Sequence, residues 1–194
     1  SLPDGNASED PYVETVKRGL NYLFSKLRVV TISQGTNCPS GDPDTNGNGI
    51  GLGVDSGQEI YEFGPTMLAI VFARNKSLVA ETGDSTYVKG QTYYNITQDM
   101  ADIAAWGQSE GSSATGIENK GGWRYSWNSV TSDMSTTKWV MIGLMLAEID
   151  WQVTIPDWVK TNLYDYIYYS AIPNGVGTNG FGYDVGETSS TLAR

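Results

Sequence analysis

Residues 121–139 read GGWRYSWNSVTSDMSTTKW, and the interpretation of this stretch decides the predicted fold. Two glycines lead into an aromatic loop, and Asp133 then stands just before an apolar run that extends from Trp139 to Ala147. An acidic side chain in front of a helix accepts hydrogen bonds from the free amides of the first turn and favours the positive end of the helix dipole. The stretch therefore predicts a loop that ends at Asp133 and a buried helix that begins immediately after it.

The same pattern of loop and helix start recurs in the chain. Gly180-Phe-Gly-Tyr183 followed by Glu187-Thr-Ser-Ser-Thr191 repeats it, and Glu62-Phe-Gly-Pro-Thr66 is a looser copy. The intervals between the copies are long enough for two helices and their loops. Internal repetition of this kind is typical of proteins built from stacked helical units.

Periodicity predicts helices and no alternating strand. Apolar residues at helical spacing predict one-sided helices at 10–29, 88–108 and 156–171. The segments 64–76 and 134–149 are apolar on all sides, so they are expected to be neighbours and the most buried helices. We therefore predict a single all-α domain over residues 1–194, with an inserted Asp/Asn/Gly-rich loop at 35–57.

Gly121–Ser126 followed by Asp133–Trp139 resembles the repeat of the alpha/alpha toroid in the terpenoid cyclase and protein prenyltransferase superfamily. The likeness is closest to the squalene-cyclase-like repeat proteins of prokaryotes, and it covers residues 58–194. It implies helical hairpins around a central cavity. Because the third copy of the pattern comes just before Arg194, a partial ring is expected, whose open flank is covered by the remainder of the same protein or by another copy.

The catalytic signatures of the resembled superfamily do not carry over. The Asp-x-Asp-Asp motif of the cyclases matches only at Asp133, the zinc site of the prenyltransferases needs histidine and the chain has none, and Cys38 lies outside any thioester motif. Asp133 is thus the one candidate catalytic residue. The interpretation as a helix cap is favoured because Glu62 and Glu187 stand at equivalent positions.

Composition excludes several classes of function. The net charge of -10 opposes binding to nucleic acid, and no apolar run is long enough to span a membrane. Without histidine, the usual general base is missing, and a single cysteine allows no internal disulfide. Glycosylation sequons at Asn6, Asn75 and Asn95 favour an extracellular or cell-surface glycoprotein.

The inserted loop is a candidate calcium site. Asp42, Asp44, Asn46 and Asn48 alternate along it, and side-chain oxygens at every second position suit a hard cation. Counted from Asp42, the twelfth position of an EF-hand-like loop is Gly53 rather than Glu, so Asp55 or Glu59 would have to close the site. The alternative is a cluster of turns without a metal.

Two further groups of side chains are candidates for a functional role. Five aromatic residues are expected to gather at one mouth of the ring, where they could hold a glycan or an apolar ligand, or simply pack loops over helix ends. They are Trp123, Tyr125, Trp127, Phe181 and Tyr183. Asp99 and Asp102 form an acidic pair three residues apart, which we interpret as a solvated helix face.

These observations favour a secreted or cell-surface module without catalytic activity, acting as a structural or ligand-binding scaffold and stabilised by calcium. One alternative is a cyclase- or lyase-type enzyme whose catalytic residues lie in repeats outside this chain. A metal-bound receptor for a lipid or glycan is a third interpretation.

Overall fold

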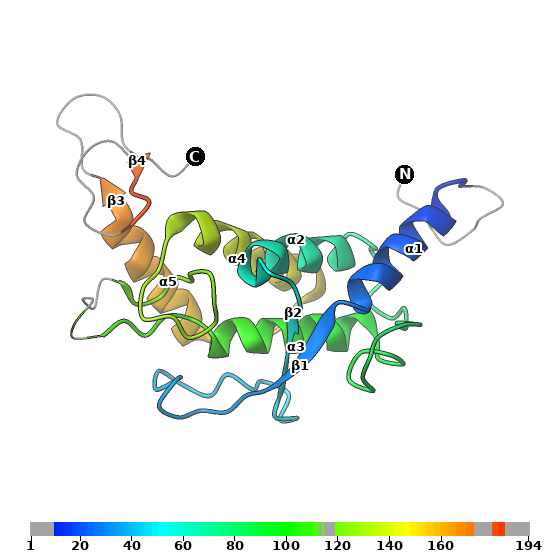
Figure 1. Ribbon diagram of the computed structural model, residues 1–194, viewed down its shortest axis with the longest axis horizontal. Helices are drawn as coiled ribbons and strands as arrows, with labels where there is room; N and C mark the ends of the chain where they lie inside the picture. Colours follow the sequence, from blue (N-terminus) through cyan, green and yellow to red (C-terminus); the bar gives the residue numbers. More distant parts are fainter. Residues whose placement is uncertain (1–9, 113, 115–118, 173–179, 185–194) are drawn as a thin grey trace.

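The computed structural model describes residues 10–112, 114, 119–172 and 180–184, and within them a pair of short strands follows the first helix and another pair follows the last (Figure 1). The α-helices are α1 (Val13–Phe24), α2 (Glu59–Val71), α3 (Tyr93–Trp106), α4 (Met134–Leu146) and α5 (Asp157–Ser170), and a π-helical turn, η2 (Ala147–Trp151), extends α4. Strands β1 (Leu27–Thr31) and β2 (Ile50–Val54) form one antiparallel sheet, and β3 (Ala171–Ile172) and β4 (Gly180–Phe181) form another. The described residues therefore have a mixed α/β fold, and the predicted all-α toroid is wrong.

The β1–β2 sheet is the feature that the periodicity missed. Leu27 pairs with Val54 and Thr31 with Ile50, so the predicted helix at 10–29 ends at Phe24 instead. β2 has the sequence Ile-Gly-Leu-Gly-Val and is buried along its whole length. A Cβ atom on Gly51 would lie 2.6 Å from the Cβ of Ile103, so this glycine lets β2 approach α3 closely.

Helices α2 and α4 pack against each other, which confirms that the two apolar segments are neighbours. Their backbones come so close that a Cβ atom on Gly64 would lie 2.0 Å from the carbonyl oxygen of Trp139. Gly143 faces Gly64 from the opposite side of the contact. Small residues at both positions are what allow this close approach.

The most buried helix is α3, however, and not α2 or α4 as predicted. Every residue from Ile96 to Ala105 is buried, because α2 and β2 both pack on this helix. α4 instead exposes Ile142 and Met145. In Figure 1, α3 lies across the middle of the molecule beneath α2 and α4, with α1 towards one end and α5 towards the other.

One of the predicted helix starts has a different place in the structure. Glu62 lies inside α2, whose N-terminal cap is Gln58, so it does not cap a helix as its position in the looser copy predicted. Glu187 lies outside the described residues. None of the helices in the described ranges has the length and apolar character that crossing a membrane requires.

Candidate functional site

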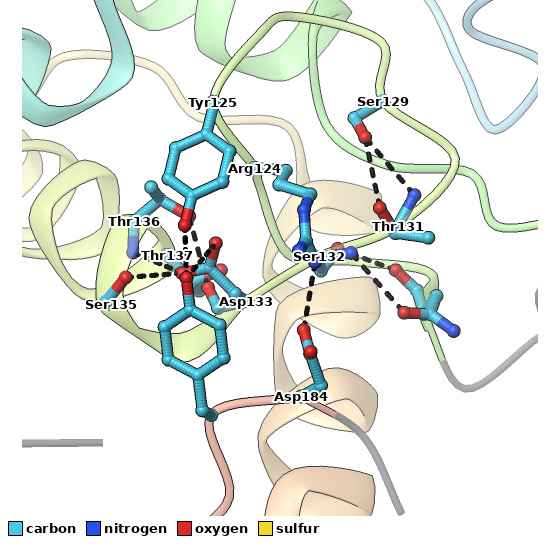
Figure 2. A network of polar contacts seen from close by, with 12 residues as sticks. Arg124, Tyr125, Ser129, Thr131, Ser132, Asp133, Ser135, Thr136, Thr137 and Asp184 are labelled. Carbon is cyan, nitrogen blue, oxygen red and sulfur yellow. Dashed lines mark hydrogen bonds and ion pairs between the residues drawn. The ribbon is translucent and has the colours of Figure 1, made fainter. Parts of the chain in front are cut away.

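Asp133 is the centre of a polar network at the start of α4 (Figure 2). Its side chain is fully buried, and its backbone is extended, as an N-cap requires. The Oδ1 atom accepts hydrogen bonds from the Thr136 amide at 2.9 Å and from the Ser135 hydroxyl at 2.6 Å. Asp133 thus caps α4, as the acid in front of an apolar run predicted.

The loop before Asp133 is fastened to the first turn of α4. The Trp123 amide donates to Thr137 Oγ1 at 2.9 Å, and the Thr136 hydroxyl donates to the Trp123 carbonyl at 2.7 Å. Gly121 has a φ of +101°, and a Cβ atom there would lie 1.9 Å from the Asn162 carbonyl oxygen on α5. The glycine therefore meets both a conformational and a spatial requirement.

Three tyrosines surround the Asp133 carboxylate. The hydroxyls of Tyr125 and Tyr183 touch each other, and the Tyr183 hydroxyl donates to Asp133 Oδ2 at 3.5 Å. The Tyr61 hydroxyl is 2.7 Å from Ser135 Oγ, and the rings of Tyr61 and Tyr125 have centroids 5.9 Å apart. Burial raises the pKa of Tyr61, and the hydrogen bond with Ser135 acts in the opposite direction.

Residues 180–184 bring the second copy of the glycine-aromatic pattern to the first. The Met134 amide donates to the Tyr183 carbonyl at 2.9 Å, and Arg124 forms an ion pair with Asp184 at 2.9 Å. The Arg124 guanidinium also lies over the Tyr125 ring, 5.4 Å from its centroid. The two copies, far apart in the sequence, therefore form one site.

The predicted aromatic cluster is only partly assembled. Tyr125 and Tyr183 meet at Asp133, and Phe181 is exposed on the same segment as Tyr183. Trp123 is buried in the core, where its indole nitrogen donates to the Ala104 carbonyl at 3.0 Å. Trp127 packs edge-on against Phe63 at a centroid distance of 5.1 Å. The two tryptophans therefore join loops to the core and do not contribute to the tyrosine group.

A second candidate site lies where the inserted loop meets α3. Both Asn46 and Asn48 donate their amide nitrogens to Asp99 Oδ1, at 2.7 and 2.9 Å. Asp44 accepts hydrogen bonds from the backbone amides of Gly47 at 2.9 Å and Gly49 at 2.7 Å, which curls the loop around its carboxylate. Two of the predicted calcium ligands, Asn46 and Asn48, thus converge on one buried carboxylate, and a third, Asp44, shapes the loop that holds them.

The solvated face predicted for Asp99 and Asp102 is wrong, because both side chains are buried beneath this loop. Thr45 covers Asp102, donating its hydroxyl to Oδ1 at 2.7 Å. Burial raises the pKa of both carboxyl groups, that of Asp102 to about 7, although hydrogen bonds from Thr45 and Gln98 lower it. Two acidic residues three apart on a helix indicate a solvated face, because no neighbouring residue shows that a loop distant in the sequence covers them.

The other predicted ligands have different positions. Asp42 Oδ1 accepts from the Asp44 amide at 3.1 Å, at the start of the curled loop. Asp55 follows β2, and the extended strand separates it from Ile50 by about 16 Å. Glu59 is paired with Arg28. Asp55 and Glu59 therefore lie away from the loop. Asp99 is instead the residue that could complete the set of calcium ligands.

Counting the loop from Asp44 gives a better match to an EF-hand pattern than counting from Asp42. Gly49 then takes the sixth position and Asp55 the twelfth. The count from Asp42 overlooks this alignment. In the structure, strand β2 nevertheless places Asp55 away from the loop. Within the described ranges, no three Asp, Glu, Cys or His side chains form a group that could hold a metal ion. The set at the loop consists of two carboxylates, Asp44 and Asp99, with the Asn amides.

The sequon residues that the structure describes lie on the surface. Asn75 and Asn95 are both exposed, and Asn6 falls outside the described residues.

Comparison of the chain with known protein families, with curated proteins and with solved structures gave no match in any of the three. The resemblance to the terpenoid cyclase and prenyltransferase toroid is therefore not supported by a family match, and the mixed fold contradicts it.

Proposed function

We propose that this chain is a secreted or cell-surface module that acts as a non-catalytic scaffold, in which a calcium ion fixes the inserted loop to α3. The observation that carries this proposal is the convergence of Asn46 and Asn48 on the buried carboxylate of Asp99, next to Asp44. Oxygen ligands from carboxylates and amides are the set that calcium prefers.

The amide groups can present oxygen to a cation at the same positions. A half-turn of an Asn side chain exchanges its nitrogen and oxygen, so Asn46 and Asn48 would then direct oxygen atoms towards Asp99. This turn gives up the local hydrogen bonds that their oxygens accept from the amides of Asn48 and Ile50. A divalent cation would offset that loss, because it compensates carboxylates that are costly to bury as anions.

The place of the loop explains why such an ion would serve a structural role. α3 is the most buried helix, so an ion bound by Asp99 connects a long surface loop directly to the core. Calcium sites in extracellular modules bind in the range of about 10⁻⁴ to 10⁻³ M. The exposed sequons at Asn75 and Asn95 support the same location.

Calorimetry with calcium and with a chelator tests the proposal. Calcium should raise the melting temperature in a saturable way, since a ligand that binds only the folded state stabilises it. Asp99→Asn should remove this response, whereas the matched control Asp55→Asn should keep it, because Asp55 lies beyond β2. A melting temperature that is the same in chelator and in millimolar calcium would reject the calcium site.

The proposal also includes a partner. Ile142, Met145 and Ile149 are exposed by 40%, 50% and 70%, along α4 and η2. We infer that the remainder of the same protein or another copy of the chain covers these apolar side chains.

A further inference from the structure

A cleft of about 700 Å³ lies between α1 and the C-terminal end of α2. Residues of both helices line it, together with residues from the segment 75–81 and Tyr93 at the start of α3. Binding sites for small molecules in proteins occupy about 300 to 1,000 Å³, so the cleft is large enough for one. It shares no residue with the calcium loop at Asp99 or with the network at Asp133.

The walls of the cleft are mainly apolar and only partly covered. Val13, Val16 and Leu20 recur at helical spacing, which places them on one side of α1, and all three line the cleft. Phe72 and Leu78 line it from the other side. In Figure 1, α1 lies at an angle to α2 at one end of the molecule, and Val16, Phe72 and Leu78 are 40%, 44% and 43% exposed. These side chains can therefore still bury an apolar ligand between the two helices.

Tyr93 places a polar group without a partner in this cleft. The residue is only 6% exposed, its ring packs against that of Phe24, and its hydroxyl makes no hydrogen bond within the part of the chain that the structure describes. Burial raises the pKa of the phenol, as does the charge of Glu81, whereas Lys17 lowers it. Nearly all buried polar side chains in proteins are hydrogen-bonded, so the Tyr93 hydroxyl indicates a ligand with a polar end.

The charges around the cleft favour a cationic ligand. Lys17 is paired with Glu81 and Arg74 with Asp150, each at 2.9 Å, so an acidic ligand would find both cations of the lining already paired. Glu14 lines the cleft three residues before Lys17 and has no ion pair of its own among the described residues. Two carboxylates thus face one ammonium group on this side, and the chain carries a net charge of -10. A positive group would balance Glu14.

We propose that the cleft between α1 and α2 binds a small amphiphile with an apolar body and an amine head. The apolar body lies between Val16 on α1 and Phe72 on α2, where it removes apolar surface from water. The amine head lies at Glu14, and one of its hydrogens is donated to the Tyr93 hydroxyl. The ligand adds a binding site to the proposed scaffold and does not require the calcium ion.

Titration calorimetry with octylamine, 1-octanol and octanoate tests this inference, because the three probes share one alkyl chain and differ in the charge of the head. Octylamine, which is a cation at pH 7, should bind saturably to one site. It should bind about fivefold more tightly than octanoate, since an exposed ion pair contributes up to about 1 kcal/mol and a like-charge contact opposes binding by a similar amount.

Three variants place the ligand in the cleft. Ala69→Leu fills it from α2 with a residue that suits a helix, and should weaken octylamine and 1-octanol alike by about tenfold or more. Glu14→Gln should lower the affinity for octylamine to that for 1-octanol and leave 1-octanol unchanged. Glu62→Gln is the matched control, because Glu62 is exposed on α2 and does not line the cleft. Tyr93→Phe should weaken octylamine about fivefold through the lost hydrogen bond.

Melting temperatures of the free proteins separate binding from folding. Tyr93→Phe removes a hydroxyl without a partner, so its melting temperature should be unchanged or raised while affinity falls. Equal octylamine binding by the parent protein and by Ala69→Leu would show that the probe binds elsewhere, and octanoate binding as tightly as octylamine would exclude an amine ligand. Either result, or no binding of octylamine, overturns the inference. The titrations are repeated in chelator, where failure of the calcium site leaves octylamine binding intact.

Discussion

At the scale of single residues, Asp133 has a role that its sequence neighbours already indicate. The acid stands before an apolar run, and the structure shows it accepting the Thr136 amide as an N-cap. Local signals of this kind depend only on adjacent residues, so the sequence alone predicts them. The second contact, from the Tyr183 hydroxyl, depends on a segment that the chain folding brings close and that no local pattern specifies.

The cap predicts how substitutions at Asp133 affect stability. Asp133→Asn should change the free energy of unfolding little, because Asn accepts the Thr136 amide about as well. Asp133→Ala should cost about 1 kcal/mol, since the amide of the first turn then loses its partner. Urea denaturation measures both. Equal losses in the two variants would show that charge, rather than capping, is what Asp133 contributes.

Asp102 predicts an unusual pH dependence. Burial raises the pKa of its carboxyl group from 3.8 in a free side chain to about 7, so the folded state binds a proton that the unfolded state has released between these values. Stability from this group is therefore fully present below about pH 4 and is lost as pH rises to about 7. The loss is on the order of 2 to 4 kcal/mol.

Melting in chelator from pH 4 to pH 8 measures the effect of Asp102. Asp102→Asn has no group to titrate, so its melting temperature should fall less over this range than that of the parent protein. The absolute stability of the variant is not the readout, because an amide replaces one of the oxygens that accept from Thr45 and Gln98. Parallel pH profiles in the two proteins would contradict the role of Asp102.

At the scale of elements, the five helices follow from apolar spacing, whereas their ends and the strands do not. The segment at 27–31 continues a helical pattern locally, but its backbone pairs with residues 50–54, which lie beyond a long loop. β2 contains two glycines and lacks the alternation of a surface strand, because both of its faces are covered. Tertiary contacts, and not propensity, decide both cases.

The contact between α2 and α4 predicts a sharp difference between two glycines. In Gly64→Ala the new Cβ would lie 2.0 Å from the Trp139 carbonyl oxygen, which is backbone and cannot move aside without shifting α4. We expect a loss of about 3 kcal/mol or more. Gly19→Ala in α1 meets no atom within 4 Å and should stabilise the protein by about 0.5 to 1 kcal/mol.

Chemical denaturation of the two alanine variants distinguishes packing from helix propensity. Propensity alone would make both variants more stable, because alanine is a better helix former than glycine. A stable Gly64→Ala protein would show that α2 and α4 are further apart in solution than in the structure.

At the scale of the whole molecule, the repeated glycine-aromatic pattern led to the wrong architecture. Two copies of the pattern do meet in space, through Tyr125 and Tyr183. That contact, however, is a local junction between α4, α5 and the segment at 180–184. The β1–β2 sheet packed on α3 is not compatible with a ring of helical hairpins. A repeated joint specifies how helices begin, but the way they assemble depends on the contacts between them.

The exposed apolar stripe on α4 and η2 leads to a prediction about assembly. Ile142, Met145 and Ile149 follow one another at spacings of three and four residues, which places them along one side. A net charge of -10 on each copy opposes association at low salt, and salt screens this repulsion while leaving the apolar contact intact. The purified chain should therefore associate at high protein concentration, and more strongly in 0.5 M than in 0.05 M salt.

Sedimentation velocity over a range of protein concentrations measures this association. The double variant Met145→Ser, Ile149→Ser should remain monomeric, and its melting temperature should change little because both side chains are at least half exposed. Tyr22→Ser on α1 is the control, since Tyr22 is 63% exposed on a different helix and should leave association unchanged. A monomer of 21.1 kDa at every concentration and at both salt levels would show that the stripe does not bring copies of this chain together. Because the charge and the stripe are separate features, a salt dependence without an effect of the double variant would place the contact on another surface.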